Sequence, residues 1–104
     1  MLHDLEQEDY KGLRVDDEFD RAARYLASRW AFKEAMVKAS GNTSLFYPGM
    51  YLMKPTPAGK PIPTIEGEKN TRILYDELKV SSIHASLSHE DHFAVAFVLF
   101  ETLM

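Results

Sequence analysis

Apolar side chains recur at helical spacing over residues 17–40, and this is the clearest periodicity in the chain. The recurring positions are Phe19, Ala22, Ala23, Leu26, Trp30 and Val37. Three acidic residues precede the pattern, as is typical of a helix N-terminus, and Gly41 follows it. We therefore predict a long helix over residues 17–40. A short acidic helix is predicted over residues 1–12, ending near Gly12.

Prolines are frequent in the middle of the chain, at positions 48, 55, 57, 61 and 63. Each proline removes a backbone donor and fixes φ, so no helix is expected to continue through this stretch. Short strands are predicted instead over residues 50–54 and 62–65, joined by a turn over residues 58–61. Asn70 is then predicted to cap a second helix that runs through Leu78.

The last part of the chain has the composition of strands. Residues 80–87 include the β-branched Val80 and Ile83, and from Ile83 onward apolar and polar side chains alternate. The apolar run over residues 93–101 allows two interpretations. Its two alternating sets of apolar side chains favour a strand, whereas Ser88 and Asp91, placed as in a capping box, favour a helix. We predict a strand that forms a hairpin with residues 83–87.

Composition narrows the class of protein. The 104 residues, 45% hydrophobic and 27% charged, are expected to form one domain with a single core. The absence of cysteine excludes a disulfide scaffold and a thiolate metal site. A net charge of −4 argues against nucleic acid as a partner, and the longest apolar run is too short to span a membrane. No secretory signal opens the chain, so a cytoplasmic location is expected.

Glu34 and Lys38 are one turn apart in a part of the long helix that is apolar on nearly every side. A carboxylate in such surroundings requires a partner, because an unpaired buried charge is costly. One interpretation is an ordinary Glu-to-Lys pair on a solvated stripe. The other is a metal-binding carboxylate with a nearby ammonium for an anionic substrate.

Cations are concentrated along the same helix, at Arg21, Arg24, Arg29, Lys33 and Lys38. A run of charge on a helix is usually its solvated face. Guanidinium groups near a buried carboxylate are also what a phosphate-rich substrate requires. The cations therefore favour phosphate binding without specifying it.

Three histidines, His84, His89 and His92, occur within nine residues. They suggest a zinc site, but on a hairpin strand His84 and His89 project to opposite faces, and the usual two-histidine helical spacing is absent. The alternative is a polar hairpin turn that carries histidines. We favour the polar turn.

Three motifs in this sequence resemble those of one enzyme family. Residues 25–39, YLASRWAFKEAMVKA, resemble the signature helix of the holo-acyl-carrier-protein synthase type of 4′-phosphopantetheinyl transferase, an aromatic residue followed by W/F-A-x-K-E-A-x-x-K-A. Residues 59–61, GKP, resemble the family's G-K-P turn. Residues 83–89, IHASLSH, followed by the strand over residues 93–101, resemble its closing hairpin. The resemblance spans residues 19–101.

The resemblance implies transfer of the phosphopantetheine arm of coenzyme A to a serine of an acyl carrier protein, with release of 3′,5′-ADP. It implies an α+β fold in which one long helix packs on a small, mostly antiparallel sheet, and a homotrimer with active sites between subunits. It also implies Mg²⁺ as cofactor. This metal suits the chemistry because it binds hard oxygen ligands and neutralises charge on a leaving phosphate.

Site residues follow from the same resemblance. Glu34 matches a magnesium ligand, and Lys38 matches a catalytic lysine close to the pyrophosphate. Arg29 matches an arginine near the nucleotide phosphates, and Arg21 is a weaker match of that kind. Three further residues fall where the family's turn and hairpin close over coenzyme A, namely Lys60, Pro61 and His89. The acceptor of the serine proton is left open between a carboxylate and a metal-bound water.

The family begins with a strand carrying G-x-D, whose aspartate is a further magnesium ligand, and with a basic helix that docks the carrier protein. Neither motif occurs in this sequence, whose first residues resemble the segment that follows that helix. We therefore expect the single domain over residues 1–104 to be N-terminally incomplete. The alternative function is a non-catalytic coenzyme A-binding or interaction domain.

Overall fold

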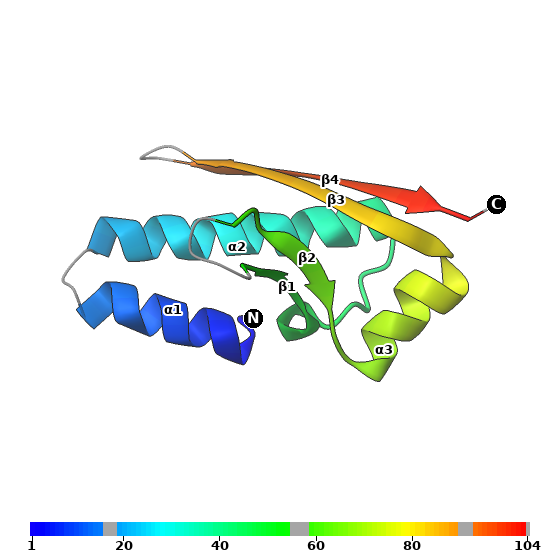
Figure 1. Ribbon diagram of the computed structural model, residues 1–104, viewed down its shortest axis with the longest axis horizontal. Coiled ribbons are helices and arrows are strands. Elements are labelled where there is room, and N and C mark those ends of the chain that lie inside the picture. Colours follow the sequence, from blue (N-terminus) through cyan, green and yellow to red (C-terminus); the bar gives the residue numbers. More distant parts are fainter. Residues whose placement is uncertain (16–18, 55–58, 90–92, 104) are drawn as a thin grey trace.

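The computed structural model describes residues 1–15, 19–54, 59–89 and 93–103. Helix α1 (Asp4–Val15) and the longer helix α2 (Phe19–Ser40) lie side by side and run in opposite directions (Figure 1). The elements that follow are the 3₁₀ turn Tyr47–Gly49, strands β1 (Met50–Met53) and β2 (Ile62–Ile65), helix α3 (Glu68–Thr71) with its π-helical continuation Arg72–Glu77, and strands β3 (Val80–His89) and β4 (Ala94–Thr102).

Helix α2 is the central element of the fold. Helix α1 covers one side of it, and the hairpin of β3 and β4 covers the opposite side (Figure 1). Strands β1 and β2 form a second antiparallel pair, separate from the hairpin. The predicted α+β class is confirmed, with two small antiparallel sheets in place of one. No helix among the described residues combines the length and the apolar character needed to cross a membrane.

The core lies between α2, the hairpin of β3 and β4, and the segment over residues 45–74. Phe32 and Met36 supply it from α2 and are fully buried. Burying one such side chain contributes about 1.5–3 kcal/mol. The other buried members of this cluster are Leu45, Met50, Leu52, Ile73, Leu74 and Val80.

Both predicted strand pairs form. Strand β1 pairs with β2 from Met50↔Ile65 to Met53↔Ile62, although the predicted turn over residues 58–61 lies partly outside the described residues. Strand β3 pairs with β4, which resolves the last apolar run as a strand. Along β4, alternate side chains are half-buried against the core and exposed, as the period of a strand requires.

The long helix has nearly the predicted limits. It ends at Ser40, and Gly41 adopts a φ of 68° while its N–H donates to the carbonyl oxygen of Val37 at 2.9 Å. A glycine in this left-handed conformation is a common helix end. The prediction that α1 ends near Gly12 is wrong, since the helix continues to Val15. A glycine inside a helix costs only about 1 kcal/mol, which packing against a neighbouring helix can offset.

The prediction that Asn70 caps the second helix is also wrong. Helix α3 begins at Glu68, and Asn70 is fully buried within it. Its amide accepts the N–H of Phe46 at 2.7 Å and donates to the Phe46 carbonyl at 2.8 Å and the Glu66 carbonyl at 3.2 Å. The side chain therefore serves distant backbone groups, which are costly to bury without partners.

Candidate functional site

Helix α2 presents two different sides. Trp30, Glu34 and Lys38 recur every four residues and so share one side, which we call the outer stripe. Trp30 is 46% exposed, Lys38 is exposed and Glu34 is half-buried. Arg29 and Lys33, also four residues apart, contact α1 and form what we call the inner pair. The predicted site residues of α2 are thus divided between two environments.

Glu34 takes its hydrogen bond from a tyrosine. The hydroxyl of Tyr47 donates to Glu34 Oε1 at 2.8 Å, and this bond raises the pKa of Tyr47, so the hydroxyl keeps its proton. The ring of Trp30 lies against that of Tyr47, with the centroids 5.4 Å apart. Among the described ion pairs, none within 4.0 Å joins Glu34 to Lys38. The ordinary Glu-to-Lys pair considered from the sequence does not form.

Lys33 is a structural cation. Its ammonium group is fully buried and donates to Glu6 Oε1 at 2.8 Å and to the carbonyl oxygens of Tyr47 at 2.9 Å and Met50 at 2.6 Å. Burial lowers the pKa of Lys33, and the carboxylate of Glu6 opposes that change. These bonds occupy all three ammonium protons, so Lys33 has no donor left for a phosphate.

Arg29 lies beside α1. Its side chain is 12% exposed, and the guanidinium stands 4.4 Å above the ring of Tyr25. Its Nη1 donates to Ser28 Oγ at 3.2 Å, while its Nε lies 3.5 Å from Glu6 Oε2 without a hydrogen bond. Arg29 Nε and Glu6 Oε2 are both buried. The predicted contact of Arg29 with nucleotide phosphates stays a prediction, and in this structure the arginine faces Glu6.

The remaining predicted residues lie elsewhere. Lys60 is exposed and Pro61 half-buried, directly before β2. Arg21 belongs to α2, and His89 is the last residue of β3 and pairs with Ala94, but both of their side chains are outside the described part. The roles of these four residues stay predictions.

The histidines behind the zinc alternative are only partly described. His84 forms a hydrogen bond with Glu101 across the hairpin. His92 and the side chain of His89 lie outside the described residues. In the part of the chain that the structure describes, no three His, Asp or Glu side chains are grouped so as to hold a metal ion.

Glu34 nevertheless fits a magnesium ion that is shared with a phosphate substrate. Mg²⁺ in such sites is commonly bound through one or two carboxylates, with substrate phosphates and waters completing the shell. The carboxylate of Glu34 is half-buried, and only its Oε1 takes a hydrogen bond from the described residues. The second oxygen is therefore available to a metal.

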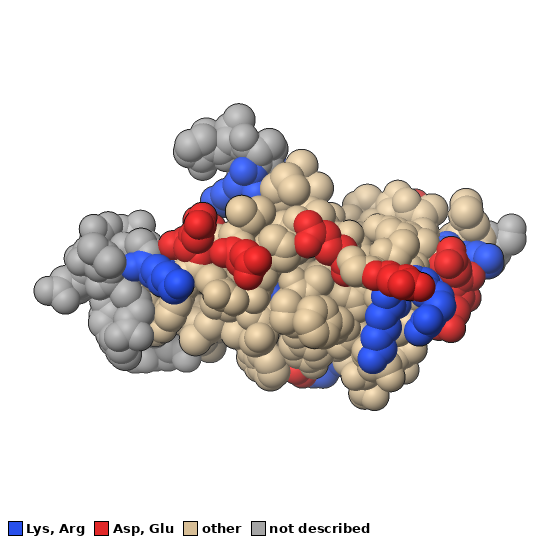
Figure 2. Space-filling model, turned by 90° about the horizontal axis from the view of Figure 1, so that it is seen from below, with Lys and Arg blue, Asp and Glu red and all other residues tan. Residues whose placement is uncertain are grey.

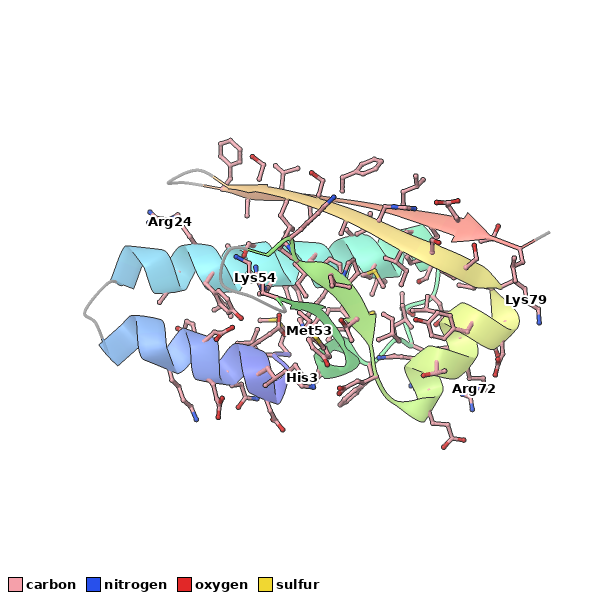
Figure 3. The ribbon with its side chains drawn as sticks, viewed as in Figure 1. His3, Arg24, Met53, Lys54, Arg72 and Lys79 are labelled. Atoms are coloured by element: carbon pink, nitrogen blue, oxygen red, sulfur yellow. The ribbon has the colours of Figure 1, made fainter. Side chains whose placement is uncertain are left out.

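A separate hollow of about 370 Å³ opens at the start of α1. His3, which lies there below β1 in Figure 3, stacks on Tyr51 and forms a 2.7 Å hydrogen bond with Glu66. Tyr51 donates to the other oxygen of Glu66 at 2.8 Å, and these two bonds lower the pKa of Glu66. None of the predicted site residues lines this hollow, and its central polar groups bond to one another.

Charged side chains on the underside of the molecule are mixed. Figure 2 shows acidic side chains in a band across the middle of this face, with Lys and Arg toward both ends. Arg24 projects from α2 on the side away from α1 (Figure 3). The described part of the underside thus presents no continuous basic patch, which agrees with the net charge of −4.

Sequence reasoning missed two residues of this network. Tyr47 lies in the proline-rich segment, where only its aromatic character next to Pro48 gives a weak signal. Glu6 appears in the sequence as one more acid of an acidic helix, although it is 2% exposed. Its partner Lys33 is 27 residues away, so no local pattern could identify the pair.

The chain is similar to known proteins over most of its length. The family model of the 4′-phosphopantetheinyl transferase superfamily matches residues 1–98. A holo-[acyl-carrier-protein] synthase of Aliivibrio salmonicida is 37% identical, over 98% of this chain and 76% of that protein.

Solved structures agree with this relationship. The holo-ACP-synthase of Plasmodium yoelii, 22% identical, shares the fold over 100% of this chain and 76% of its own, with a TM-score of 0.75. The holo-[acyl-carrier-protein] synthase of Helicobacter pylori, solved in complex with coenzyme A, is 27% identical over 89% of this chain and 74% of its own, with a TM-score of 0.63. The chain belongs to the 4′-phosphopantetheinyl transferase superfamily, and its relatives there are transferases of the holo-acyl-carrier-protein synthase type.

Proposed function

We propose that this chain transfers the 4′-phosphopantetheine arm of coenzyme A to a serine of an acyl carrier protein. The observation that carries the proposal is the outer stripe of α2, where the half-buried Glu34 precedes the exposed Lys38 by one turn. The names of the relatives support a carrier protein as acceptor, and the Helicobacter pylori complex supports coenzyme A as donor.

The reaction exchanges one phosphorus–oxygen bond for another. The serine oxygen attacks the phosphorus that carries the pantetheine arm, and the bond from that phosphorus to the bridging oxygen breaks. The products are phosphopantetheinyl-serine, 3′,5′-ADP and one proton. Such a transfer depends chiefly on positioning and on stabilising the negative charge of the leaving group. Lys38 is suited to that task because its exposed ammonium can approach the pyrophosphate.

Glu34 is the residue that would hold Mg²⁺. When bound, the ion would supply charge neutralisation at the phosphates. The carboxylate is the donor type that Mg²⁺ prefers, and its surroundings leave Oε2 without a partner among the described residues. Lys60, Pro61 and His89 are proposed to contact coenzyme A, as are Arg29 and Arg21.

We also propose that the active form is a homotrimer. Val95, Phe97 and Leu99 lie on the outer face of β4 and are 54%, 63% and 51% exposed. An exposed apolar face of this kind favours association, because association buries additional apolar surface of a small domain. Light scattering should give three times the 11.9 kDa of the chain, whereas a monomer at working concentration would contradict the trimer.

The transfer is tested by mass spectrometry of the acceptor. The purified chain is incubated with coenzyme A, Mg²⁺ and an apo-acyl carrier protein, and the carrier protein should gain the mass of one phosphopantetheine. A chelator should stop the gain, and added Mg²⁺ should restore it. Coenzyme A binding with no mass gain would contradict the proposal and favour a non-catalytic coenzyme A-binding domain.

A further inference from the structure

Tyr47 is held in place independently of Glu34. The carbonyl oxygen of Tyr47 accepts a hydrogen bond from the buried ammonium of Lys33 at 2.9 Å, and the same ammonium binds the carbonyl of Met50 at 2.6 Å. These two carbonyls lie at the beginning and just after the end of the turn Tyr47–Gly49. The backbone that carries the tyrosine is thus tied to α2 from both sides.

The other side of this turn is fixed by close packing. The N–H of Glu66 donates to the carbonyl of Gly49 at 2.7 Å. A Cβ at Gly49 would lie 2.4 Å from the Glu66 carbonyl oxygen and 2.5 Å from Asn70 Nδ2, so only glycine allows this approach. The turn therefore cannot shift toward β2.

From these contacts we propose that Tyr47 is a positioning residue for the metal-binding carboxylate of Glu34. Its hydroxyl holds Oε1 at 2.8 Å, which restricts the rotation of the side chain and leaves Oε2 as the oxygen for the metal. Tyr47 acts through Glu34 and touches neither substrate nor metal. The inference rests on the proposed function, because it assumes that Glu34 binds Mg²⁺.

The physical reason is the cost of ordering a flexible ligand. A free glutamate side chain loses rotamer freedom when it binds a metal, and a hydrogen bond formed beforehand removes part of that loss. Residues that orient metal ligands in this way typically contribute about 10–100-fold in metal affinity. Trp30, whose ring lies 5.4 Å from that of Tyr47, limits the movement of the tyrosine ring.

The variant Tyr47→Phe removes only the hydroxyl. Tyr51→Phe is its matched control, because Tyr51 also donates to a glutamate at 2.8 Å, but to Glu66, which follows β2 and bonds to His3. Mn²⁺ serves as the probe, since it shares the preference of Mg²⁺ for carboxylate and water ligands. Free Mn²⁺ is measured by electron paramagnetic resonance with coenzyme A present and no carrier protein, so the readout does not depend on turnover.

We expect the dissociation constant for Mn²⁺ to rise about 10-fold in Tyr47→Phe and to stay at the wild-type value in Tyr51→Phe. Coenzyme A binding in the presence of a chelator should be equal in all three proteins, which a general structural defect would not allow. Unchanged or tighter Mn²⁺ binding in Tyr47→Phe would overturn the positioning role of Tyr47 and leave the proposed function standing. A wild type without Mn²⁺ binding in the presence of coenzyme A would overturn the magnesium role of Glu34 and the inference with it.

Discussion

The two lysines of the α2 motif lie five residues apart in opposite environments. Lys33, in the inner pair, is fully buried and donates all its protons to Glu6 and two backbone carbonyls. Lys38, in the outer stripe, is exposed. One lysine therefore joins the elements of the fold, and the other is open to a substrate. Residue type and motif position therefore do not assign a role to a lysine until its burial is known.

The inner pair also supports the outer stripe. A buried ammonium is tolerated only with a charged partner and complete hydrogen bonding, and Lys33 has both. Its bonds connect α1, α2 and the turn Tyr47–Gly49, and this turn supplies the hydroxyl that holds Glu34. The buried side thus fixes the turn whose tyrosine holds Glu34 on the open side.

Lys33→Met should give the largest loss of stability. Removing one partner of a buried pair costs about 3–5 kcal/mol in the free energy of unfolding. In this variant the carboxylate of Glu6 still faces Arg29, whose Nε lies 3.5 Å away without a hydrogen bond. Urea denaturation measures this loss. Lys38→Met is the matched control and should stay within about 0.5 kcal/mol of the wild type, as is usual for exposed positions.

The double variant Glu6→Gln, Lys33→Met should recover part of that stability, because it removes the carboxylate that Lys33→Met deprives of its hydrogen-bonded cation. The recovery is partial because Arg29 then loses the carboxylate that it faces. Equal losses in Lys33→Met and Lys38→Met would show that the two lysines do not differ as the structure implies.

Alkaline pH should lower the free energy of unfolding by less than Lys33→Met does. This loss originates in tyrosines outside the outer stripe. Burial raises the pKa of Tyr25 and of Tyr51 to about 12, from an ordinary value of 10.0. Between these values the unfolded chain loses the phenolic protons while the folded chain keeps them, so stability falls as the pH rises. Lys33 acts in the opposite direction, because its lowered pKa makes stability rise with pH until the unfolded value of 10.5 is reached.

From pH 10.5 to 12 the opposing effect of Lys33 fades, so the tyrosines dominate the change in stability. Urea denaturation at several pH values in this window should show a steady loss of stability, less steep in Tyr51→Phe than in the wild type. A free energy of unfolding that stays constant across the window would contradict the burial of these two hydroxyls.

The parts of the fold that sequence could predict are those with a local pattern. The long helix and the closing hairpin follow from apolar periodicity, and both are confirmed. At Asn70 hydrogen bonds to distant backbone groups replace the capping role that local rules favour, and at Gly12 the helix continues past the glycine. Glu34 and Lys38 could be named from a motif, but the motif says nothing of which groups surround them.

Tyr47 and Glu6 could not be predicted as part of the site. The hydroxyl of Tyr47 reaches Glu34 only because the segment after α2 folds back along it, and Glu6 meets Lys33 only because α1 and α2 lie side by side. Such contacts depend on tertiary structure, which single-sequence patterns do not encode. The network that supports the site thus becomes visible only in the assembled fold.

We propose that Glu34 serves catalysis and not folding, and the variant Glu34→Gln tests this role. The amide can still accept the hydroxyl of Tyr47, so the urea-denaturation curve should match that of the wild type. The mass gain of the carrier protein should slow by about 100–1000-fold, as is typical when one group that stabilises developing charge is lost. The exposed Glu77→Gln is the control and should retain full transfer. Wild-type transfer by Glu34→Gln would contradict a catalytic role of Glu34.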